Sequence, residues 1–234
     1  LKVKKYPTYV AFAGCLCIIA VLLLRWYTSG RAPWATLYET AALLSLVTGI
    51  AASYSYRQKE APVMYLALAL ITLILLVFAA LSWDAATALP ASLESGWLLV
   101  HVPVVILAYG LFTVSFAASA GFIALKVMGK KDSKAIQRLD RASYLSAAAG
   151  LALLIFGIVL GAMWAKVAWG AYWSWDPKET WSLITAIVYA IYLFARLRGM
   201  KAEDAAFISI LGFLSVIFTY IGVSYIIPGL HSYA

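Results

Sequence analysis

Seven long, continuous runs of apolar residues constrain the fold of this sequence more than any other feature. A membrane hydrocarbon core of roughly 30 Å takes about 20 apolar residues per helix. Backbone polar groups in lipid must be satisfied within the chain, so such runs predict helices. The chain is therefore expected to be all-α, a polytopic bundle of about seven transmembrane helices. The runs cover 8–26, 36–54, 62–83, 97–126, 143–166, 181–198 and 205–227.

Composition supports one integral membrane domain over residues 1–234. Of the 234 residues, 65% are hydrophobic and 12% are charged, whereas an ordinary soluble domain is about half apolar and a quarter charged. This excludes a soluble enzyme and a disordered tail. The two cysteines, Cys15 and Cys17, point about 200° apart on a helix. We therefore interpret them as apolar filling in the first span, which we keep as an anchor.

The basic residues predict the orientation of the helices, because cytoplasmic loops carry an excess of Lys and Arg. With a cytoplasmic N-terminus, all but four of the 18 basic residues fall on the inner side, and an odd number of spans places the C-terminus outside. The net charge of +8 is then a topology signal and predicts no nucleic-acid partner. The inner set is Lys2, Lys4, Lys5, Arg57, Lys59, Lys126, Lys130, Lys131, Lys134, Arg138, Arg141, Arg196, Arg198 and Lys201; the outer set is Arg25, Arg31, Lys166 and Lys178.

All nine tryptophans fall on the predicted outer side, and five of them lie in the segment 164–181. Interfacial anchoring normally places aromatic residues at both membrane surfaces, so it does not by itself explain this one-sided set. Two interpretations stay open: an aromatic belt, or a platform for a large, flat, apolar ligand at the outer surface. The tryptophans are Trp26, Trp34, Trp83, Trp97, Trp164, Trp169, Trp173, Trp175 and Trp181.

The chain has only two histidines, and both are expected on the same outer side. His101 begins the fourth span and His231 follows the seventh. A single interfacial histidine is more often a solvated or hydrogen-bonded residue than a ligand. Two of them on the tryptophan-rich face favour a pair of axial ligands to the iron of a planar macrocycle.

Asp176 and Glu39 are the acidic residues that most need an explanation. Asp176-Pro177-Lys178-Glu179 has the pattern of a helix start, with Asp at the N-cap, Pro at the first helical position and Glu at the third. Glu39 begins the second span, and intramembrane acids often mark functional sites. It lies near the outer face as well, so we expect Glu39 to hydrogen-bond within the same outer site.

The segment 169–176, Trp-Gly-Ala-Tyr-Trp-Ser-Trp-Asp, resembles the tryptophan-rich WGxxWxWD signature of membrane proteins that handle haem in cytochrome c maturation. Its continuation over 177–184 resembles the CcsA (ResC) branch of System II, the WWD-domain proteins. Further similar stretches are 32–39, 93–102 and 229–233. The similarity runs from about residue 30 to the end of the chain.

This resemblance implies a haem site at the outer face. It implies that the external tryptophan-rich segment 164–181 binds haem b and that His101 and His231 ligate its iron. The protein would then be a subunit of a holocytochrome c synthase, although no side chain resembles an acid–base catalyst. The implied platform residues are Trp169, Gly170, Tyr172, Trp173, Trp175 and Asp176.

The resemblance also implies partners and a location. A ResB/CcsB-type membrane protein would complete the synthase, and apocytochrome c would present the thiols of a Cys-x-x-Cys-His motif. A thioredoxin-like thiol reductant is a further expected partner. The membrane would be a bacterial plasma membrane or a thylakoid, with the haem site on the periplasmic or lumenal side.

The sequence departs from the family pattern at one position. Family members commonly carry a His in a Tyr-Leu-His context of the sixth span, but here the third residue is Phe194. A second, intramembrane haem site that uses this subunit is therefore in doubt. The outer site does not depend on it, and Lys166, Lys178 or Arg31 could pair with the haem propionates there.

Two other functions stay open from the sequence. The first is a haem exporter or chaperone that passes haem to another carrier without ligating it. The second is a quinone- or ion-linked membrane subunit with an aromatic outer loop. That second function predicts ionisable residues in the middle of the spans, of which the sequence offers almost none.

Overall fold

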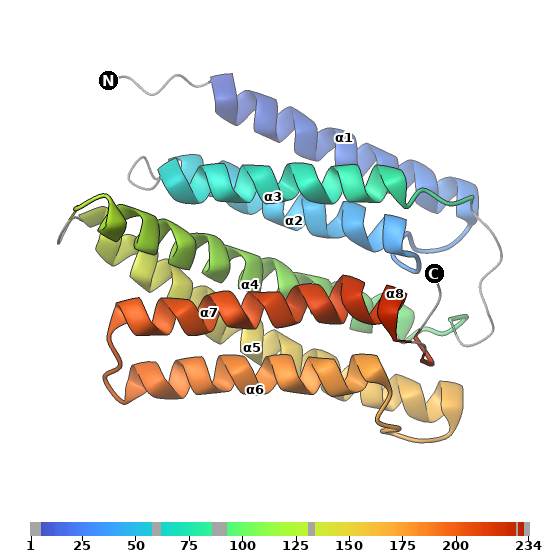
Figure 1. Ribbon diagram of the computed structural model, residues 1–234. Helices are drawn as coiled ribbons and strands as arrows, with labels where there is room; N and C mark the ends of the chain where they lie inside the picture. The colour runs from blue at the N-terminus through green and yellow to red at the C-terminus, as the bar shows by residue number, and fades with distance from the viewer. Residues whose placement is uncertain (1–5, 58–61, 86–92, 131–133, 228, 232–234) are drawn as a thin grey trace.

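The computed structural model describes residues 6–57, 62–85, 93–130, 134–227 and 229–231. Seven helical segments are long and apolar enough to cross a membrane, and no described residue is in a strand. This confirms the predicted all-α fold. In chain order (Figure 1) the elements are α1 (Tyr6–Ser29), α2 (Leu37–Arg57), α3 (Pro62–Leu81), α4 (Leu98–Val127), α5 (Lys134–Trp169), α6 (Pro177–Leu197), α7 (Ala202–Ile217), the π-helical turn η1 (Phe218–Gly222) and α8 (Val223–Ile226). Five basic residues named above and the last two residues of the 229–233 stretch lie outside the described residues: Lys2, Lys4, Lys5, Lys59, Lys131, Ser232 and Tyr233.

The helices around the tryptophan-rich segment are longer than the apolar runs. Helix α5 begins at Lys134 rather than 143, and Ile136 and Leu139 in its extra turns are buried. Its other end reaches Trp169, and α6 begins at Pro177, four residues before the apolar run and where the capping pattern predicted it. The irregular connection is therefore only 170–176, shorter than the expected 164–181 loop.

Helix α4 joins two groups of helices. Helices α1, α2 and α3 lie side by side on one side of the bundle, and α5, α6 and α7 lie on the other (Figure 1). Helix α4 contacts α2 and α3 as well as α5 and α7. The core between α4 and α6 contains Phe112 stacked on Tyr189, with ring centroids 3.7 Å apart. Gly212 of α7 leaves room for this ring, because a Cβ there would lie 2.9 Å from the ring of Tyr189.

The two ends of the bundle differ sharply in composition. All nine tryptophans lie at or near the end where α2, α4 and α6 begin, which we name the aromatic end. The opposite end, where α5 and α7 begin, carries every described basic residue of the predicted inner set, and we name it the basic end. The bundle thus separates the two kinds of residue along its long axis.

A buried ion-pair cluster ties the first three helices together at the aromatic end. Glu39 is 0% exposed, and its two carboxylate oxygens lie 2.8 Å from Arg25 Nε and Arg31 Nη1. Arg25 also pairs with Asp84, which follows α3, at 3.0 Å. This arrangement satisfies a buried carboxylate by charge and hydrogen bonds together. Glu39 therefore bonds within this cluster and does not line the pocket described below, so the expectation that it hydrogen-bonds within the outer site was wrong.

Candidate functional site

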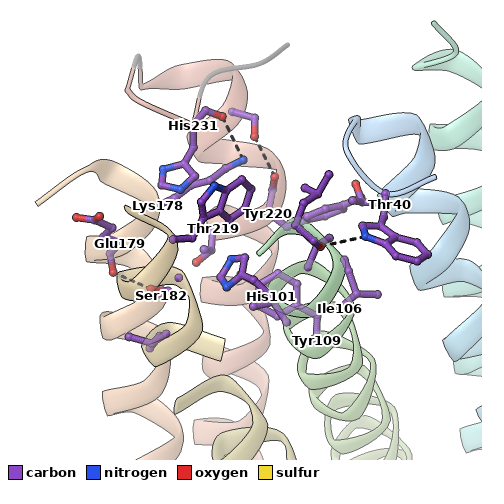
Figure 2. A pocket seen from close by; sticks show the side chains of 18 of the residues that line it. Thr40, His101, Ile106, Tyr109, Lys178, Glu179, Ser182, Thr219, Tyr220 and His231 are labelled. Atoms are coloured by element: carbon purple, nitrogen blue, oxygen red, sulfur yellow. Dashed lines mark hydrogen bonds between the residues drawn. The ribbon is translucent and has the colours of Figure 1, made fainter. Parts of the chain in front are cut away.

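A pocket opens at the aromatic end between α2, α4, α5, α6 and η1 (Figure 2). Both histidines of the chain line it, although 130 positions of sequence separate His101 from His231. Indole rings supply much of the surrounding wall. The tryptophans that line the pocket are Trp34, Trp164, Trp169 and Trp173.

His101, in the first turns of α4, is held so that one ring nitrogen is free. Its Nδ1 lies 2.9 Å from the carbonyl oxygen of Gly157 on α5. A carbonyl only accepts, so Nδ1 donates its proton and Nε2 keeps its lone pair. Gly161 makes room for the ring, because a Cβ there would lie 2.8 Å from Cε1. The ring also packs edge-on against Trp164, with centroids 5.6 Å apart.

His231 is held in the same way by a side chain. Its Nδ1 lies 2.7 Å from Oδ2 of Asp176, and its ring packs edge-on against Trp169 with centroids 4.9 Å apart. Burial of Asp176 opposes ionisation of its carboxyl. Hydrogen bonds from His231, Lys178 N and Leu230 N outweigh this and hold the pKa of Asp176 below its ordinary value. Asp176 therefore accepts as a carboxylate, and Nε2 of His231 is left free.

The carboxylate of Asp176 also forms the start of α6. It accepts a hydrogen bond from Lys178 N at 3.0 Å, while Glu179 Oε2 accepts one from Asp176 N at 3.1 Å. This reciprocal pair is a capping box and confirms the predicted N-cap. Leu230 N donates to the other oxygen of Asp176. Gly229 permits this approach, since a Cβ there would lie 2.6 Å from Oδ1.

The predicted platform residues separate into two sets. Trp169 and Trp173 line the pocket, whereas Tyr172 and Trp175 are 55% and 68% exposed and do not. Gly170 has φ +83° and lets the chain leave α5. Trp175 has φ +60°, a conformation that is strained for a bulky residue.

Sequence reasoning missed several residues that shape the pocket. Tyr220 and Thr219 reach it from the π-helical turn η1, and the Tyr220 hydroxyl lies 3.0 Å from Thr40 Oγ1 of α2 (Figure 2). No sequence pattern in the seventh apolar run predicts the π-helical turn η1. Gly157 and Gly161 were also missed, although their spacing of four places both on one face of α5.

The arrangement can hold a metal that brings its own equatorial ligands. Among the described residues, no group of three His, Cys, Asp or Glu side chains is placed to hold a metal ion. Two imidazoles with free Nε2 atoms, surrounded by indole rings, suit instead the axial positions of a flat metal macrocycle. Metal-ligating histidines usually donate their other ring N–H to a backbone carbonyl or a carboxylate, and these are the acceptors that the Nδ1 atoms of His101 and His231 have here.

The chain matches one protein family over most of its length. The model of the "Cytochrome C assembly protein" family matches residues 34–231. The matched region begins at Trp34 and ends at His231, which are the first and last residues in the pocket wall. The chain belongs to the CcsA family of cytochrome c assembly proteins.

Individual CcsA relatives align over almost the whole chain. The cytochrome c biogenesis protein CcsA of Chlamydomonas reinhardtii is 38% identical and aligns with 100% of this chain and 69% of its own length. CcsA of Guillardia theta is 36% identical, over 94% of this chain and 82% of its own. Protein NrfI of Wolinella succinogenes is 40% identical over 91% of this chain, which corresponds to 24% of NrfI.

Proposed function

We propose that this integral membrane protein acts in cytochrome c maturation as the haem-handling subunit of a cytochrome c synthase. In this function it presents haem b at the aromatic end for covalent attachment to apocytochrome c. Family membership supports the role in maturation. One observation carries the specific proposal: two histidines with free Nε2 atoms line the same tryptophan-walled pocket.

The residues of the chain act in this proposal by binding and positioning. His101 and His231 would hold the iron through their free Nε2 atoms, and Trp164, Trp169 and Trp173 would cover the apolar surface of the substrate. Each thioether forms when a cysteine S–H adds across a haem vinyl group, so no leaving group is required. Holding the vinyl groups in one orientation toward the incoming thiols lowers the entropic part of the barrier.

The proposed orientation places the aromatic end outside the membrane, where apocytochrome c would meet it. It follows from the excess of basic residues at the opposite end. A ResB/CcsB-type protein and a thioredoxin-like thiol reductant are the proposed partners. Position 194 on α6 is Phe, so this chain offers no imidazole at that intramembrane position. The Phe194 side chain is 64% exposed. Any haem ligand there would come from the partner.

The experiment is to express the chain with its partner in a host that lacks its own cytochrome c maturation. We expect His101→Gly and His231→Gly each to lose the two-imidazole haem spectrum and holocytochrome formation, and added imidazole to restore part of both. Trp83→Phe is the control, because Trp83 lies at the aromatic end outside the pocket. Full haem content and unchanged spectra in both glycine variants would contradict the proposal. Haem transfer without covalent cytochrome, with the partner present, would favour a haem exporter.

A further inference from the structure

Lys178 places a cation in the wall of the histidine pocket. It is the second residue of α6 and is partly buried beside His231 (Figure 2). Its Nζ donates to the backbone carbonyl oxygen of His231 at 3.4 Å, which is a long and therefore weak bond. An ammonium group has three donors, so this contact leaves most of its capacity unused.

No carboxylate of the described residues forms an ion pair with Lys178. The Asp176 carboxylate interacts with Lys178 electrostatically but forms no ion pair with it. One of its oxygens accepts from Leu230 N and the other from Lys178 N and His231 Nδ1. Glu179 has one oxygen occupied by Ser174 and by Asp176 N. A partly buried cation in an aromatic wall is costly unless an anion compensates it.

The other three cations at the aromatic end are already engaged elsewhere. Arg25 and Arg31 both bind the buried carboxylate of Glu39 at 2.8 Å. Lys166 lies outside the pocket wall; its Nζ donates to Gly170 O at 2.8 Å and lies 5.6 Å from the centre of the Tyr172 ring. Of these four, Lys178 is the one that lines the pocket and forms no ion pair with a carboxylate of the described residues, although the Asp176 carboxylate interacts with it electrostatically.

We infer that Lys178 binds a carboxylate of the substrate, so that the pocket selects a flat macrocycle with acidic side chains on one edge. This inference rests on the proposed function. In haem the two propionates leave from one edge and the vinyl groups lie on the other pyrroles. An ion pair at Lys178 therefore fixes the rotation of the macrocycle about the axis between the two histidines and directs the vinyl-bearing part away from α6.

The test compares haem with its dimethyl ester, which lacks the propionate charges, on the purified full chain. We expect esterification to weaken binding to the unsubstituted protein about 10- to 100-fold, as for a lost charged hydrogen bond. The Lys178→Met variant is expected to bind both compounds equally, at the affinity of the unsubstituted protein for the ester. Lys178→Arg is expected to keep the discrimination. Lys166→Met is the matched control and is expected to behave like the unsubstituted protein.

Two results would overturn the inference. One is equal binding of haem and its ester by the unsubstituted protein with an intact two-imidazole spectrum, which leaves the proposed function standing. The other is an unchanged preference for haem over the ester in Lys178→Met. Absence of a two-imidazole spectrum from the unsubstituted protein would instead contradict the proposed function, and this inference with it. The thermal unfolding midpoint of each variant is measured as well, and a midpoint equal to that of the unsubstituted protein excludes unfolding as the cause of a difference in binding.

Discussion

At the scale of single residues, Asp176 joins three parts of the site. One carboxylate caps α6, binds the chain before His231 through Leu230 N, and orients the His231 ring. Sequence alone predicted the cap, because its pattern is local. The bond to His231 spans 55 positions and could not be predicted from spacing.

Replacement of Asp176 separates these roles. Asn is about as good an N-cap as Asp, so Asp176→Asn is expected to keep the cap of α6. Its single side-chain oxygen replaces only one of the two accepting oxygens of Asp176, so either the bond from Leu230 N or the bond from His231 is lost and the unfolding midpoint falls modestly. The loss of charge next to His231 is expected to weaken haem binding about 10- to 100-fold, as for other partners of metal-ligating histidines. Haem titration of the purified protein measures this. Asp140→Asn at the basic end is the control, and equal haem affinity in both variants would contradict the expected role.

Tyr189 and Tyr192 offer a matched test of the buried core. The hydroxyl of Tyr189, a residue that is 0% exposed, has no hydrogen-bond partner among the described residues, whereas that of Tyr192 lies 3.0 Å from Ser143 Oγ. Removing an unsatisfied hydroxyl is not destabilising, but removing a bonded one costs about 0.5–1.5 kcal/mol. We expect Tyr189→Phe to keep or raise the unfolding midpoint and Tyr192→Phe to lower it. An equal drop in both variants would show that the Tyr189 hydroxyl has a partner.

At the scale of helices, apolar length predicted every span but not every end. The extra turns of α5 from Lys134 are amphipathic, so a search for continuous apolar runs stops short of them. The start of α6 at Pro177 was predicted correctly from its capping pattern. The π-helical turn η1 was not, because its residues are as apolar as those around it and only the packed structure selects that turn.

Helix α5 gives a prediction at this scale, because Gly161 clears the space that the His101 ring occupies. Ala is about 1 kcal/mol better than Gly inside a helix, so Gly161→Ala is not expected to unfold the protein. Its methyl group would displace the His101 ring and lower haem affinity. Gly14→Ala in α1 is the control, since nothing lies within 4 Å of a Cβ there. Haem titration and thermal unfolding of both variants check this, and unchanged haem binding by Gly161→Ala would be evidence against the role of Gly161.

At the scale of the whole molecule, the separation of charge and aromatic residues along the bundle predicts how it lies in the membrane. In a variant without Cys15 and Cys17, a cysteine at Ala171 is expected to react with a membrane-impermeant maleimide added to intact cells. A cysteine at Met200 is expected to react only after the membrane is opened. Both positions are exposed and lie at opposite ends of the bundle. The reverse labelling pattern would contradict the predicted topology and show that the basic end faces outward.

The two histidines are fixed in different ways, and this has a mechanical consequence. The His101 ring on α4 donates to a backbone carbonyl oxygen of α5. Rotation of a side chain on α5 therefore cannot remove this acceptor. The His231 ring depends on one carboxylate at the start of α6, at the end of the short 170–176 connection. A shift of Asp176 would therefore break the Nδ1 hydrogen bond of His231 and leave that of His101 in place.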